Sequence, residues 1–155
     1  MSDIFEFVFY CAEIIGTVAF AASGAMLAID RDLDLFGVIF LGIIAAVGGG
    51  ILRDALLGIV PPGAFTNSVY VAVAFVTSLV VFLYADMRGG RYWRQRGAVD
   101  RVVNLLDAVG LGIFSVIGTQ TAMNRGFDGN AFLCIFMGMT TGVGGGILRD
   151  VLSQT

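Results

Sequence analysis

The sequence contains no histidine and no lysine, because all nine of its basic residues are arginine. No side chain can therefore supply a histidine proton switch or the imidazole ligands of a histidine-rich metal site. Charge of either sign is scarce, at 14% of residues against roughly 25% in soluble domains. The net charge is −3 and the arginines gather mostly in one stretch, which argues against nucleic acid as a partner.

Cysteine and proline are equally rare, with two of each. Cys11 and Cys134 lie inside apolar runs, where a reduced buried thiol is expected rather than a disulfide or a metal ligand. No serine or cysteine nucleophile has a base nearby in the sequence, and Gly48-Gly49-Gly50 lacks the Gly-Lys-Ser/Thr that completes a phosphate loop. The sequence therefore predicts no enzyme site, no resident metal and no cofactor.

Apolar residues are abundant, at 57% of the chain with a mean hydropathy of +0.90. A membrane-spanning helix needs about 20 mostly apolar residues. Five runs meet or approach that length, which predicts an all-α integral membrane protein surrounded by lipid. The expected helices cover residues 7–29, 35–52, 68–85, 102–122 and 131–148. The start of the chain has no basic region, so we expect the first run to be a retained helix rather than a cleaved signal peptide.

The longest polar stretch, residues 86–101, holds five arginines, from Arg88 to Arg101. Because cytoplasmic loops carry an excess of basic residues, this stretch is predicted to be cytoplasmic. Counting helices back from it places Arg31 on the same side and the acidic N-terminus outside. Trp93, beside the arginines, is open to two interpretations: an anchor in the membrane interface, or an aromatic side chain of an ordinary loop.

A repeated motif divides the chain. Residues 47–54, Val-Gly-Gly-Gly-Ile-Leu-Arg-Asp, recur without change as residues 143–150. Upstream, Glu13 matches Asp107 and Phe20 matches Phe114 at one constant spacing. We therefore predict a first repeat over residues 1–86, an arginine-rich linker over residues 87–101 and a second repeat over residues 102–155.

The first repeat holds three helices, an odd number, so the second must enter the membrane in the opposite direction. Such inverted repeats occur in many transporters, with the functional site near the membrane midplane. Because the second repeat supplies only two of the expected helices, we expect it to be incomplete as the chain stands.

The two glycine triplets are the first candidates for function: Gly48, Gly49, Gly50, Gly144, Gly145 and Gly146. Glycine costs about 1 kcal/mol against alanine inside a helix, so three in succession do not serve helix stability. One interpretation is a break or hinge whose freed backbone groups line a polar pathway. The other is close helix packing through small residues. Consecutive glycines point to different sides of a helix, and this favours the break.

An arginine and an aspartate follow each triplet at the same interval: Arg53, Asp54, Arg149 and Asp150. They are open to two interpretations, as charges at the mouths of a pathway or as groups reaching the membrane surface. Since neighbouring residues do not face each other on a helix, we expect each to pair with another helix rather than with its neighbour.

Two acids inside apolar runs, Glu13 and Asp107, also stand out. A carboxylate at membrane depth is energetically costly and usually faces the bundle interior, so each is a candidate for contact with a cation. The alternative is a structural acid paired with arginine or backbone N–H groups, which suits Asp107 better. Thr140 and Thr141 are candidates to supply hydroxyls to a pathway, whereas Ser23 and Thr119 can equally bond their own helix.

Three sequence features resemble the prokaryotic trimeric intracellular cation channel family, which overlaps bacterial membrane proteins labelled glycine transporters. They are the doubled Gly-Gly-Gly-x-x-Arg-Asp, residues 20–25 (Phe-Ala-Ala-Ser-Gly-Ala) and residues 106–112 (Leu-Asp-Ala-Val-Gly-Leu-Gly). The resemblance implies a homotrimer in a prokaryotic inner membrane, with a pore permeable to potassium in each subunit. It further implies seven helices, of which the second and fifth kink at the glycine triplets and line the pore.

The leading hypothesis from the sequence is thus a passive channel for a monovalent cation, potassium or sodium. The alternative is a secondary transporter of a small zwitterion such as glycine, which would use the same broken helices. A third hypothesis, a membrane scaffold, needs the glycines only for association.

Overall fold

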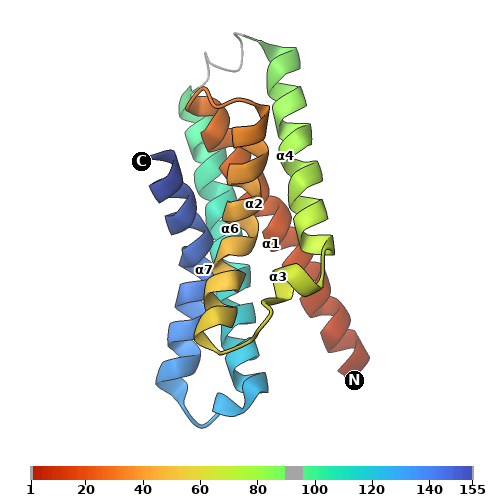
Figure 1. Cartoon of the computed structure of the whole chain (residues 1–155), viewed down its shortest axis with the longest axis vertical. Coiled ribbons are helices and arrows are strands. Elements are labelled where there is room, and N and C mark those ends of the chain that lie inside the picture. The colour runs from red at the N-terminus through yellow and green to blue at the C-terminus, as the bar shows by residue number, and fades with distance from the viewer. Residues whose placement is uncertain (1, 90–95, 155) are drawn as a thin grey trace.

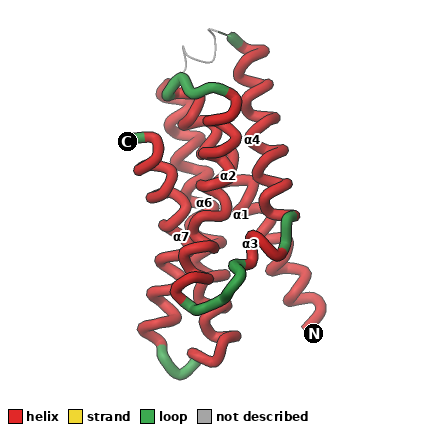
Figure 2. Tube along the Cα trace, in the orientation of Figure 1, coloured by secondary structure: helices red, strands yellow, loops and turns green. Residues whose placement is uncertain are grey.

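The computed structural model describes residues 2–89 and 96–154 and contains an elongated bundle of helices (Figure 1). Five of these helices are long and apolar enough to span a membrane. The loop at residues 31–34 lies at one end of the bundle and the loop at residues 128–130 at the other (Figure 2). The predicted all-α membrane fold is confirmed. The elements in chain order are α1 Ser2–Asp30, α2 Leu35–Leu56, α3 Gly63–Thr66, α4 Val69–Arg88, α6 Arg96–Ala122, the π-helical turn η1 Met123–Phe127 and α7 Ala131–Ser153.

The long helices exceed their predicted lengths, most of all where charged residues were expected to end them. α6 begins at Arg96 instead of Val102, so Arg101 belongs to a helix rather than to the linker. α2 and α7 continue past their Arg-Asp pairs to Leu56 and Ser153. The pairs therefore lie inside helices, where backbone hydrogen bonding continues around them. Trp93 lies outside the described residues.

Matching side chains begin the second helix of each repeat. The Asp34 carboxylate accepts a hydrogen bond from the Gly37 N–H at 2.8 Å, and the Asn130 side chain accepts one from the Leu133 N–H at 3.1 Å. Both are N-caps, which stabilise a helix by satisfying one of its free N–H groups. The repeat thus extends from the sequence motif to the local structure that starts α2 and α7.

The two repeats are inverted, as the helix count predicts. In Figure 1, α1 rises from the N-terminus and α2 descends, whereas α6 descends and α7 rises. Matching residues meet across the centre: the Phe20 and Phe114 rings stack at 5.6 Å between centroids and 4° between planes. A pseudo-twofold axis therefore passes close to this aromatic pair.

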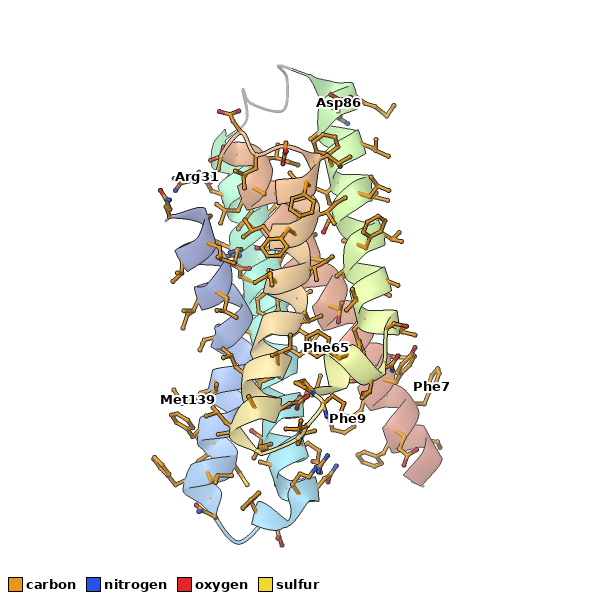
Figure 3. The ribbon with its side chains drawn as sticks, in the orientation of Figure 1. Phe7, Phe9, Arg31, Phe65, Asp86 and Met139 are labelled. Carbon is orange, nitrogen blue, oxygen red and sulfur yellow. The ribbon has the colours of Figure 1, made fainter. Side chains whose placement is uncertain are left out.

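Large apolar side chains cover the outside of the bundle. Met139 on α7 and Phe7 on α1 are 59% and 68% exposed, and Figure 3 labels both. The same figure places Arg31 and Asp86 at one end of the bundle, which is also where α4 ends and α6 begins. Since lipid is as apolar as these side chains, such an exterior suits a membrane. Which side of the membrane this end faces stays a prediction.

Candidate functional site

The glycine triplets do not break their helices. α2 and α7 are continuous α-helices through residues 48–50 and 144–146, so the prediction of a break is wrong. The two helices pack together here, and a Cβ on Gly49 would collide with the Thr141 carbonyl oxygen. In the matching contact, a Cβ on Gly145 would collide with the Ala45 carbonyl oxygen. The middle glycines therefore let two backbones touch, which agrees with the packing interpretation.

The outer glycines of the triplets meet different surroundings. A Cβ on Gly48 would lie 2.7 Å from Cδ1 of Leu148, whereas one on Gly146 would meet nothing within 4 Å. Gly50 borders a cavity, and a Cβ on it would approach only the Arg53 guanidinium, at 3.9 Å. Each triplet thus combines one indispensable helix contact with a third glycine that faces open space. The role of the triplets in lining a pore stays a prediction.

The candidate charges of the first repeat, Glu13, Arg53 and Asp54, lie near one another and close to the end of α2. The Glu13 carboxylate accepts a hydrogen bond from the Tyr70 hydroxyl of α4. Arg53 pairs with its neighbour Asp54, whose Oδ1 lies 2.7 Å from Nη2 and 2.8 Å from Nε. Asp54 is only 2% exposed and also accepts a hydrogen bond from the Gly63 N–H at 2.7 Å, which holds the start of α3. We call Glu13, Tyr70, Arg53 and Asp54 the Glu13 cluster.

The candidate charges of the second repeat gather near the end of α7, together with Ser23 of α1. Arg149 Nη1 lies 2.7 and 2.8 Å from the two carboxylate oxygens of Asp107 on α6. Ser23 on α1 donates a hydrogen bond to Asp107 Oδ1 at 2.6 Å and also contacts Arg149. Arg149 further pairs with Asp150 at 2.7 Å, although its side chain is only 7% exposed. We call Ser23, Asp107, Arg149 and Asp150 the Asp107 cluster.

The expected pairing of these charges is partly wrong. Both arginines do pair with the adjacent aspartate, because the long arginine side chain turns back along its own helix. Arg149 also pairs with another helix, as expected, and its partner Asp107 has the structural role that its position favoured. Ser23 bonds Asp107 rather than its own helix, whereas Thr119 donates to the Ser115 carbonyl at 2.9 Å.

The candidate hydroxyls lie away from the cavities described below. Thr141 is 1% exposed and donates to the Met137 carbonyl at 2.6 Å. Neither Thr140 nor Thr141 borders either of the two cavities that adjoin Glu13, among residues 2–89 and 96–154. Sequence reasoning also missed Tyr70, whose only signal is a tyrosine just inside an apolar run.

Two cavities adjoin the Glu13 cluster, with volumes of about 780 and 240 Å³. The larger, the outer cavity, lies between the start of α1 and the end of α6 and is bordered by Phe9, Glu6, Gln120 and Asn124. The smaller, the inner cavity, is bordered by Arg53, Asp54, Tyr70 and Phe114. Among the described residues, only Glu13 borders both. No member of the Asp107 cluster borders either cavity, in the part of the chain that the structure describes.

The chain matches a known membrane family. The family model described as "Glycine transporter" matches residues 10–86 and 104–155. The chain belongs to this family. Among its relatives, the UPF0126 inner membrane protein YadS of Escherichia coli K12 is 40% identical over 94% of this chain, and a UPF0126 membrane protein of Deinococcus radiodurans is 38% identical over 92%. The chain spans 66% and 61% of their lengths.

The chain is also similar to solved structures of trimeric intracellular cation (TRIC) channels. A prokaryotic TRIC channel crystallised in 0.5 M KCl aligns with a TM-score of 0.85 at 33% identity, over 96% of this chain and 71% of that one. The TRIC orthologue from Rhodobacter sphaeroides aligns at 0.81, also at 33% identity, over 94% and 70%. The resemblance to prokaryotic TRIC channels is therefore confirmed. None of these relatives is named as an enzyme.

Proposed function

We propose that this member of the glycine transporter family is a passive channel for monovalent cations, potassium among them. The observation that carries the proposal is the position of Glu13, which borders the outer and the inner cavity at once. A carboxylate at membrane depth is costly and is usually retained for function. The route would enter between α1 and α6, pass Glu13 and continue into the inner cavity beside α2.

The charges of the route favour cations. Glu6 and Glu13 border the outer cavity, and no basic residue among those that the structure describes borders it. The inner cavity has two carboxylates, Glu13 and Asp54, and one guanidinium, Arg53, which leaves one net negative charge when all three are ionised. Rings and clusters of acidic side chains select cations in channels. The alignment with TRIC cation channels supports the same proposal.

The far end of the proposed route would be closed by an aromatic pair. Phe114 borders the inner cavity and stacks on Phe20, and no described member of the Asp107 cluster borders this cavity. We therefore propose that conduction requires this aromatic pair and the Asp107 cluster to separate. The glycine triplets would serve conduction by allowing α2 and α7 to slide at their contact.

The names of the same relatives support a proposal for the oligomeric state and the membrane of this chain. Proteins of the TRIC group are named as trimeric, and YadS is named as an inner membrane protein. We propose a homotrimer in a prokaryotic inner membrane, with one route in each subunit. In this arrangement the N-terminus would be outside and the Arg88–Arg101 segment cytoplasmic.

Potassium flux from liposomes tests the proposal. Glu13→Gln keeps an oxygen that can accept the Tyr70 hydrogen bond but removes the charge, so flux should fall about tenfold or more. Asp86→Asn, a charge removal at an exposed position far from the route, is the matched control and should leave flux unchanged. Equal flux in wild-type and Glu13→Gln protein, at equal incorporation, would contradict the route.

A further inference from the structure

The first turns of α1 carry acids and aromatic residues on one face. Phe5, Phe9 and Glu13 follow one another at intervals of four residues, which places them in one row along the helix. Glu6 and Tyr10 form a second row beside it. All five residues border the outer cavity. One wall of this cavity therefore combines carboxylates with aromatic rings.

Two turns of α1 separate the two carboxylates of this wall. Glu6 and Glu13 are seven residues apart, which corresponds to about 10 Å along a helix axis. Phe9 and Tyr10 occupy the turn between them. The Tyr10 ring lies 6.5 Å from the ring of Tyr70, whose hydroxyl binds Glu13. Because no basic residue among those described borders the cavity, the wall has two negative charges with an aromatic surface between them.

The second repeat keeps the acids of this wall but not its aromatic rings. The matching positions of α6 hold two acids, two valines and an asparagine: Asp100, Asp107, Val99, Val103 and Asn104. The repeated helix therefore does not itself require an aromatic residue at any of the three positions. The rings are a feature of the first repeat alone, and they border the same cavity as its two acids.

We infer that the outer cavity binds a linear diamine, in which a short alkyl chain joins two primary ammonium groups. One ammonium would donate hydrogen bonds to Glu6 and the other to Glu13, and the chain would lie against Phe9 and Tyr10. Ammonium groups are attracted both to carboxylates and to the faces of aromatic rings. The cavity volume of about 780 Å³ lies within the roughly 300–1,000 Å³ typical of small-molecule sites. A metal ion would leave the aromatic surface unused, and a monoamine would leave one carboxylate without a partner.

This site lies at the entrance of the proposed cation route and rests on that proposal only for its effect on flux. A diamine beside Glu13 would occupy the entrance, so it should reduce potassium flux through the wild-type protein. Binding is measured separately from flux. A protein that binds a diamine but does not conduct overturns only the channel, and one that conducts but does not bind a diamine overturns only this site.

The test is calorimetric titration of the purified protein in detergent with the diamine cadaverine and with pentylamine, a monoamine of the same chain length. Cadaverine should bind about tenfold or more tightly than pentylamine, because its second ammonium gains a second carboxylate. Glu6→Gln removes one of the two carboxylates at an exposed position, so both amines should bind this variant with equal affinity. Equal affinities in the wild type would overturn the inference, and so would a difference that Glu6→Gln retains.

Phe9→Val and Tyr10→Asn provide a second test, because they introduce the residues of the second repeat and leave both acids in place. Each should weaken cadaverine binding about threefold or more, since an ammonium loses its contact with an aromatic face. Phe7→Val is the matched control and should bind as the wild type does, because Phe7 is 68% exposed and points away from the bundle (Figure 3). Wild-type affinity for cadaverine in all three variants would overturn the inference.

Discussion

The Glu13 cluster and the Asp107 cluster are built from the same repeated motif but make different contacts. Asp107 is held by a buried arginine and a serine, and it joins α1, α6 and α7 into one network. Glu13 is held by a tyrosine hydroxyl and borders two cavities. The difference arises from α3 and α4, which provide Gly63 and Tyr70 to the first cluster alone among the described residues. The same motif therefore has different partners in the two repeats, because different helices pack against its two copies.

The comparison predicts very different costs for removing the two matching acids. Asp107→Asn leaves the buried Arg149 without its main partner, and breaking a buried ion pair typically costs about 3–5 kcal/mol. Glu13→Gln keeps a hydrogen bond acceptor for Tyr70, so its cost should be about 1 kcal/mol or less. Thermal unfolding in detergent, followed by circular dichroism, measures both variants. Equal destabilisation would show that the clusters are held in the same way.

The next largest loss of stability is expected at the glycine contact between α2 and α7, which lies between the two clusters. Gly145→Ala places a methyl group against the Ala45 backbone carbonyl, and overpacking of this kind costs about 1–3 kcal/mol. Gly146→Ala is the matched control, since nothing lies within 4 Å and alanine favours a helix by about 1 kcal/mol. The same unfolding experiment should lower the melting temperature of the first variant and not of the second. A lower melting temperature for Gly146→Ala than for Gly145→Ala would contradict the interpretation that the triplets serve helix packing.

The two aspartates of the repeated motif should differ by a smaller amount. Asp54 is buried and bonds both Arg53 and the Gly63 N–H, so Asp54→Asn should cost about 1–2 kcal/mol. The Asp150 side chain is 46% exposed, where an ion pair is worth about 0–1 kcal/mol, so Asp150→Asn should have little effect. Protease sensitivity of the loop from Leu57 to Pro62 should rise in the first variant alone, because Asp54 holds the start of α3. An equal rise in both would argue against this anchoring.

The fold was largely predictable from the sequence, because its signals are local and strong. Five apolar runs and an eight-residue repeat are sufficient for the helices and their inverted order. The expected helix ends fall short of the observed ones, because a charged residue such as Arg53 after an apolar run predicts a helix boundary. An arginine that pairs with its neighbour remains compatible with an α-helix.

The candidate site was less predictable, because its contacts depend on how helices pack. Glu13 and Asp107 matched in sequence, yet nothing in their spacing distinguishes an acid bound to tyrosine from one bound to arginine. Three consecutive glycines predict a break, because packing of one helix face requires only one glycine in three or four. The structure shows that three directions around the helix are used, toward Leu148, the Thr141 backbone and the inner cavity.

The central claim is that the bundle is open at the Glu13 cluster and closed at the Asp107 cluster. Single cysteines at the matching positions Gln120 and Met26 test it, in a protein whose own Cys11 and Cys134 are replaced by alanine. Gln120 borders the outer cavity, whereas Met26 lies on α1 one turn from Ser23 of the Asp107 cluster. A charged thiol reagent should modify Gln120→Cys rapidly and from one side of the membrane only, and Met26→Cys slowly. Equal rates at both positions would contradict the account.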